Sequence, residues 1–72
     1  MADAIGLLDV VALTEDVPAR GLVRGQVGTV VEVLADGHYE VEFSDDAGRA
    51  YALAPLPLRQ LLILHYQPAH AA

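Results

Sequence analysis

The chain has 72 residues and a net charge of −6, it contains neither cysteine nor lysine, and 54% of its residues are hydrophobic. A chain of this length forms one domain, so we expect a single unit over residues 1–72, with a leader at 1–7 and a tail at 67–72. The absence of cysteine excludes disulfides and thiolate metal sites. The acidic charge disfavours nucleic acid as a partner, because the phosphate backbone is also negatively charged.

Membrane and targeting signals are not expected in this sequence. The longest apolar run, Leu61–Leu64, has the length of a strand and is too short to span a bilayer. Met1–Leu8 has no basic region and no long apolar segment, so we expect no secretory signal there. These features predict a cytoplasmic protein with no membrane partner.

The first predicted strand is Leu8–Leu13, with the β-rich sequence LDVVAL. One of its faces carries Val10 and Ala12, and the other carries Val11 and Leu13. The pattern alone leaves open which of the two faces is buried.

A long loop follows the first strand over Thr14–Gln26 and contains one proline and two glycines. Loops of this length inside a compact domain are usually packed by their own side chains. We expect Leu22 and Val23 to fold back over the end of the core, with Val17 beside them.

Residues 25–43 predict a β-hairpin, because two alternating apolar runs flank the turn signal Asp36-Gly37. A two-residue turn would pair Val33 with Glu40 and place carboxylates on the apolar face. A three-residue loop with a left-handed glycine pairs Val33 with Tyr39 instead and keeps the apolar side chains together. The parity of the pattern therefore favours the longer loop.

The three-residue loop Ala35–Gly37 divides the hairpin into two faces. The core face pairs Val31 with Val41 and carries four side chains: Val31, Val33, Val41 and Phe43. The wet face carries an acidic stripe with Asp36 at its tip: Glu32, Glu40 and Glu42. The same register places Val30 and Leu34 on the exterior.

The rest of the chain predicts two more strands. The expected elements are a turn at Ser44–Gly48, a strand at Arg49–Leu56, a 3₁₀ turn at Leu58–Leu61 and a last strand at Leu62–Tyr66. Pro55 and Pro57 are expected to end the fourth strand. The whole pattern indicates an all-β fold, a small five-stranded SH3-like barrel with a long first loop and a 3₁₀ turn before the last strand.

Four motifs between Asp9 and Leu64 carry a resemblance: DVVAL, GTVVEVL, YEVEF and QLLIL. They resemble a family of short bacterial domains that is known only as a domain of unknown function, which implies the barrel fold and no activity. The pattern G-x-x-G-x-V-V also resembles the glycine-marked strand of KOW-type modules, which bind RNA through basic loops. The barrel itself is similar to the barrel domain of nitrile-hydratase-type enzyme complexes, which implies an accessory role.

The acidic stripe can be interpreted either as a solubilising surface or as a binding surface. Carboxylates on the wet face of a strand usually keep an apolar domain soluble. The same side chains, Glu32, Glu40 and Glu42 with Asp36, form a possible docking face for a basic protein partner. Acid–base catalysis is not expected from them, because it requires a carboxylate inside a pocket that raises its pKa.

The histidines and the paired aspartates do not predict a metal site. His38, His65 and His70 fall in a turn, the last strand and the tail, without a spacing that brings them together. Asp45-Asp46 belongs to a turn that is too short for a calcium loop. We expect no cofactor, no metal and no enzymatic activity.

The last strand is apolar on both faces, whereas a strand with one wet side should alternate. Either Ile5, Leu7 and Leu8 of the leader cover it, or it meets another chain. The possible oligomer contact consists of Leu62, Ile63, Leu64, Val30 and Leu34.

These features predict a non-catalytic protein–protein interaction or accessory module whose partner is another protein or a second copy, in a dimer or small oligomer. The alternatives are a KOW-like nucleic-acid-binding module and an accessory subunit of a larger enzyme complex.

Overall fold

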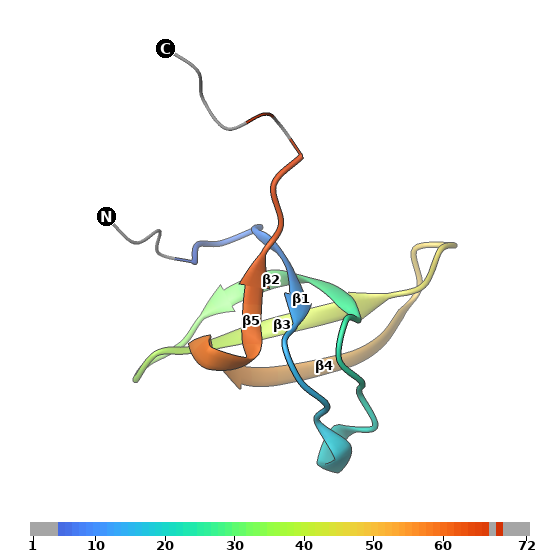
Figure 1. Ribbon diagram of the computed structural model, residues 1–72, viewed down its shortest axis with the longest axis horizontal. Coiled ribbons are helices and arrows are strands. Elements are labelled where there is room, and N and C mark those ends of the chain that lie inside the picture. Colours follow the sequence, from blue (N-terminus) through green and yellow to red (C-terminus); the bar gives the residue numbers. More distant parts are fainter. Residues whose placement is uncertain (1–4, 67, 69–72) are drawn as a thin grey trace.

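The computed structural model describes residues 5–66 and residue 68, and it consists of one antiparallel sheet (Figure 1). The elements are β1 Val10–Leu13, η1 Pro18–Arg20, β2 Val27–Val33, β3 His38–Ser44, β4 Ala50–Pro57, η2 Leu58–Gln60 and β5 Leu61–Ile63, where η denotes a 3₁₀ turn. The strand order is β4-β3-β2-β1-β5. The all-β prediction is confirmed, including the 3₁₀ turn before the last strand.

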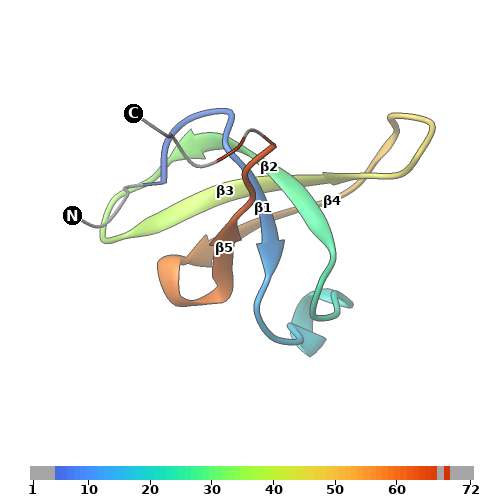
Figure 2. The ribbon, with the colours of Figure 1, turned by 45° about the horizontal axis from the view of Figure 1, so that its top comes forward.

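The sheet is curled. β1 and β5 run across the direction of β3 and β4, both in Figure 1 and in the turned view of Figure 2. The core lies on the inner side of this curl. Hydrogen-bonded pairing ends at β4 on one side and at β5 on the other, so the described part of the sheet has two open edges. Closure into an SH3-like barrel stays a prediction.

Three strand boundaries differ from those predicted. β1 begins at Val10 because Leu8 has a φ of 70°, which interrupts an extended strand. β5 is Leu61–Ile63 and ends earlier than expected. β4 continues through Pro55, which was wrongly expected to end it, and ends at Pro57. Proline is tolerated there because β4 is an edge strand, whose outward N–H groups are not needed for pairing.

The β2–β3 hairpin has the predicted three-residue loop. Glu32 pairs with Glu40 and Val33 pairs with Tyr39, as parity required. Gly37 has the expected positive φ of 70°, and Asp36 is also left-handed at 61°. These two left-handed residues form the turn tip, where the His38 N–H donates to the Ala35 carbonyl at 3.3 Å.

A β-bulge at Val31 changes the inner face of β2. The register shifts between Val30 and Glu32, so Val30 pairs with Val41 and the predicted Val31–Val41 pair is wrong. Val30 is fully buried, whereas Val31 is 38% exposed. The prediction that Val33 is buried is also wrong, because this side chain is 53% exposed near the end of the hairpin.

The core is aliphatic around one aromatic ring. Its buried members are Ile5, Val11, Leu13, Leu22, Val30, Val41, Phe43, Ala54, Leu56 and Leu61. Val11 and Leu13 identify the buried face of β1. Phe43 is fully buried and lies opposite Gly28. A Cβ added at Gly28 would lie 2.6 Å from Cγ1 of Val41 and 3.0 Å from Cδ2 of Phe43, so β2 packs against β3 without room for a side chain.

The leader and the long loop each contribute one side chain to the core. Ile5 and Leu22 are both buried, and Val17 packs against the cluster. Val23, which was also predicted to fold inward, is exposed. Leu7 and Leu8 are exposed too, so only Ile5 of the three leader residues provides apolar cover.

Truncating Phe43 tests this core. Phe43→Ala should lower the free energy of unfolding by about 3–5 kcal/mol, because it removes a fully buried ring from the centre of the sheet. The control is Leu53→Ala, a large side chain that is 53% exposed on β4, with an expected loss below about 1 kcal/mol. Urea denaturation followed by circular dichroism measures both. Equal losses in the two variants would contradict the assigned inner face.

Candidate interaction surface

The outer face of the sheet carries the chemistry that the core does not use. On β2, β1 and β5 the pairing places Val27 opposite Ala12 and Ala12 opposite Leu62. These three residues form an apolar row across neighbouring strands, in which Val27 is 46% and Leu62 is 57% exposed. Apolar side chains this exposed and adjacent mark a surface suited to protein contact.

The acidic stripe, Glu32, Glu40 and Glu42, lies beside this row on β2 and β3. Glu32 is directly opposite Glu40, and Glu42 is opposite Thr29. Like charges directly opposite each other destabilise a sheet, by up to about 1 kcal/mol. In the described residues, Asp9, Asp16 and Asp45 accept hydrogen bonds from backbone N–H groups and Glu15 accepts one from the Gln60 side chain. None of these carboxylates belongs to the stripe.

Asp36 does not extend the stripe along the strands. It lies in the exposed turn between β2 and β3, and its carbonyl is 3.0 Å from Nδ1 of His38. The stripe therefore consists of the three glutamates, and Asp36 adds a separate charge at the end of the hairpin.

β4 provides a second apolar border to the stripe. Leu53 is opposite Glu42 and Pro55 is opposite Glu40, and both β4 residues are exposed. From β4 to β5 the outer face is therefore apolar, then acidic, then apolar. An isolated solubilising charge pattern would not require large apolar side chains on both of its sides.

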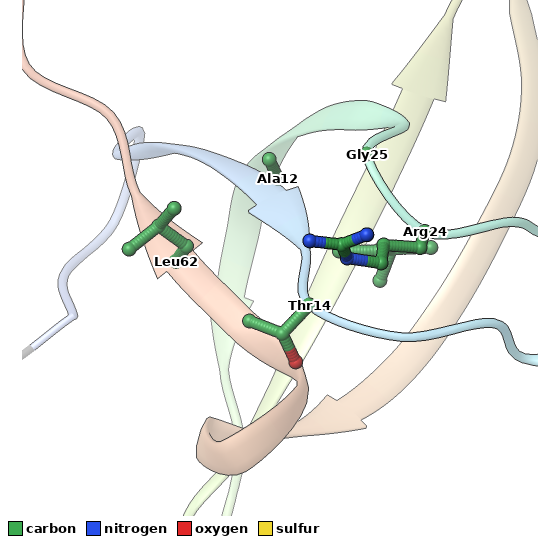
Figure 3. A pocket seen from close by; sticks show the side chains of 6 residues that line it. Ala12, Thr14, Arg24, Gly25 and Leu62 are labelled. Atoms are coloured by element: carbon green, nitrogen blue, oxygen red, sulfur yellow. The ribbon is translucent and has the colours of Figure 1, made fainter.

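A shallow open groove of about 360 Å³ lies at one end of the apolar row (Figure 3). Its lining consists of Ala12, Leu13, Thr14, Arg24, Gly25 and Leu62. Gly25 donates its N–H to the Leu13 carbonyl at 2.8 Å, which holds the loop against β1. The groove places the Arg24 side chain beside exposed apolar surface.

The loop that forms one wall of this groove is tied to η2. Thr14 donates its backbone N–H to the Gln60 carbonyl at 3.0 Å and its hydroxyl to the Arg59 carbonyl at 2.9 Å. The Gln60 side-chain amide donates to Glu15 at 2.8 Å. The Arg24 backbone N–H donates to the Asp16 carboxylate at 2.9 Å. The two acidic side chains, Glu15 and Asp16, therefore hold the loop in place through the Gln60 side chain and the Arg24 backbone.

The described titratable side chains do not converge on one site. Within residues 5–66, no group of three or more His, Asp or Glu side chains is placed to hold a metal ion. His38 is the first residue of β3 and His65 follows β5, while His70 lies outside the described residues. The carboxylates of the stripe are on an open sheet face rather than in a cleft, where general acid–base chemistry would require them.

The residues predicted as an oligomer contact have different environments. Leu62 is exposed, and Ile63, Leu64 and Leu34 are half-buried. Val30 was expected on the exterior and is instead fully buried, because the bulge at Val31 turns it inward. Sequence reasoning missed Val27, Ala12 and Leu53 as surface residues, since only the strand register shows that they share a face.

The described helical turns are short, and none is a long apolar helix that could cross a membrane.

Comparison with family models identifies the family described as "Domain of unknown function (DUF4926)", which matches residues 7–63, so the chain belongs to this family. Searches of curated proteins and of solved structures give no match.

We predict that the protein does not bind RNA or duplex DNA at physiological ionic strength. The chain has four arginines and no lysine, and the outer face carries three glutamates, so few cations are available to release counterions from phosphate. Fluorescence anisotropy with labelled oligonucleotides should show no saturable binding below about 100 μM protein. Micromolar binding that weakens steeply with salt would contradict this prediction.

Proposed function

We propose that this member of the DUF4926 family is a non-catalytic protein–protein interaction module. The observation that carries the proposal is the outer face of the sheet, where an acidic stripe is bordered by exposed apolar side chains on both sides. The partner class is a protein with an apolar patch and neighbouring lysine or arginine side chains.

The two parts of this face have separate roles. The apolar borders, represented by Leu53 on β4 and by Leu62 on β5, supply buried area and therefore most of the affinity. The carboxylates accelerate association and select a basic surface, because electrostatic complementarity acts more on association rate and specificity than on affinity.

Electrostatic strain in the free protein supports a basic partner. Glu32 and Glu40 oppose each other across the β2–β3 pair, and a partner cation placed between them would remove their repulsion. When the partner contacts the apolar borders, water is excluded from around the carboxylates. Their attraction to the partner's cations is then stronger, because the local dielectric constant is lower. A docking role as an accessory subunit of a larger enzyme complex would use this same surface.

A charge reversal on the stripe tests the proposal. Tagged parent protein and the Glu40→Lys variant are used to isolate bound proteins from native cells, and each candidate is then purified and titrated by calorimetry. The control is Asp46→Lys, which makes the same charge change in the β3–β4 turn, away from the stripe. We expect the dissociation constant of the partner to rise at least about tenfold for Glu40→Lys, equivalent to about 1.4 kcal/mol, and to change little for Asp46→Lys.

The salt dependence and a second variant complete the test. Binding of the parent should weaken as salt is raised, because the contact pairs charges of opposite sign. Leu53→Lys should also weaken it by loss of the apolar border. A purified partner that binds the parent, Glu40→Lys and Leu53→Lys equally well would overturn the assignment of this face.

A further inference from the structure

The free edge of β5 is a second feature of the described structure that could bind another chain. Leu64 donates its N–H to the Val10 carbonyl at 2.9 Å, and Thr14 donates to the Gln60 carbonyl at 3.0 Å. Residues 60, 62 and 64 therefore direct their backbone groups toward β1, since these directions alternate along a strand. Leu61 and Ile63 consequently direct theirs toward the open edge.

The backbone groups on this edge are only partly satisfied. The Leu61 N–H donates to the Leu58 carbonyl within η2, which leaves the Leu61 carbonyl and both backbone groups of Ile63 facing outward. Unpaired strand edges are templates for pairing with another strand, and proteins usually protect them with proline, charge or a bulge.

Within the described residues, the β4 edge has such protection and the β5 edge does not. Leu58, which directly follows β4, donates its N–H to the Gly37 carbonyl, so even-numbered residues near this end face β3. Pro55 and Pro57 therefore occupy outward positions and remove two donors from the β4 edge. The β5 residues Leu61–Ile63 include neither proline nor a charged side chain.

We propose that a second copy of this chain pairs with the β5 edge in antiparallel orientation about a two-fold axis at Ile63. Ile63 then exchanges two hydrogen bonds with the partner's Ile63. The His65 N–H of each copy donates to the Leu61 carbonyl of the other. A register centred on Leu62 is less favourable, because it requires the Leu61 N–H that is already bonded to Leu58.

This register also joins the two outer faces. Leu62 lies opposite the partner's Leu64. Each Leu64 is held next to β1 of its own chain, because its N–H donates to the Val10 carbonyl. The apolar row therefore continues across the axis without a polar interruption, from Val27 through Ala12 and Leu62 to the second copy. This pairing covers the Leu62 side chain, which is 57% exposed in the single chain.

The acidic stripe does not oppose the pairing, because it lies far from the β5 edge. Glu32 lies on β2, two strands away from β5. Five strand spacings, about 24 Å, separate the β2 strands of the two copies. This distance is about three times the Debye length of about 8 Å at physiological salt, so repulsion between the acidic stripes is screened.

Sedimentation equilibrium on the full chain tests the dimer. The contact is short and lies at the small end of specific interfaces, so we expect a concentration-dependent dimer in the micromolar range. Leu62→Lys should weaken it at least about 100-fold, because two leucines leave each contact. Leu53→Lys is the matched control, since Leu53 is similarly exposed on the opposite edge strand, and its dimer should be unchanged.

Cysteine pairs test the register, and the natural chain adds no thiols of its own. Residues 62 and 64 of opposite copies should have Cα atoms about 4.5 Å apart, which is within disulfide range. Oxidation of an equal mixture of Leu62→Cys and Leu64→Cys should give mainly the mixed dimer. Preferential self-linking of Leu62→Cys would overturn the axis at Ile63.

A monomeric parent at all concentrations, or a dimer that Leu62→Lys leaves intact, would overturn the edge pairing. The inference goes beyond the proposed interaction function, because it adds a second contact at the β5 edge, and its failure is distinguishable from failure of that function. Sedimentation requires no other protein, whereas the docking test with Glu40→Lys measures binding of a different chain.

Discussion

The contact between β2 and β3 around Phe43 is the constraint on which the rest of the structure depends. Gly28 leaves no space for a Cβ against Val41 and Phe43, so β2 lies directly on these side chains. Two residues later, Val30 fills the position opposite Val41 and is fully buried. At the end of the hairpin away from the turn, the even-numbered residues of β2 therefore face the core. Toward the turn, Val33 pairs with Tyr39 and the inner face falls on odd-numbered residues, so one extra residue is needed between them. Val31 is that residue, and the bulge there follows from satisfying both ends of the hairpin.

The outer face is a consequence of the same constraint. Once Val41 and Phe43 point inward, Glu40 and Glu42 must point outward, and Thr29 and Glu32 follow on β2. A small aliphatic core has few inner positions, and the remaining apolar side chains lie on the outer face and at the edges. Acidic and apolar groups are therefore neighbours on one surface rather than separated. This adjacency provides both the charge selectivity and the buried area that protein recognition uses.

Much of this arrangement could be predicted from the sequence, because alternation and turn chemistry are local. The Glu32–Glu40 and Val33–Tyr39 pairs followed from parity, and burial of Leu22 followed from the length of its loop. The bulge could not be predicted, since Val30 and Val31 are identical residues and either one fits the inner face. The extension of β4 through Pro55 depended on its edge position, which is a property of the whole sheet. The apolar row was missed for the same reason, because Val27, Ala12 and Leu62 become neighbours only when three strands are paired.

The most direct test of this account compares two adjacent and chemically identical residues. Val30→Ala and Val31→Ala remove the same two methyl groups, and the stability of each variant is measured by urea denaturation against the parent. The bulge predicts that Val30→Ala lowers the free energy of unfolding by about 2 kcal/mol or more, because Val30 is fully buried opposite Val41. Val31→Ala should lower it by less than about 1 kcal/mol, because Val31 faces outward. A larger loss for Val31→Ala than for Val30→Ala would contradict the inner face of β2 and, with it, the composition of the interaction surface.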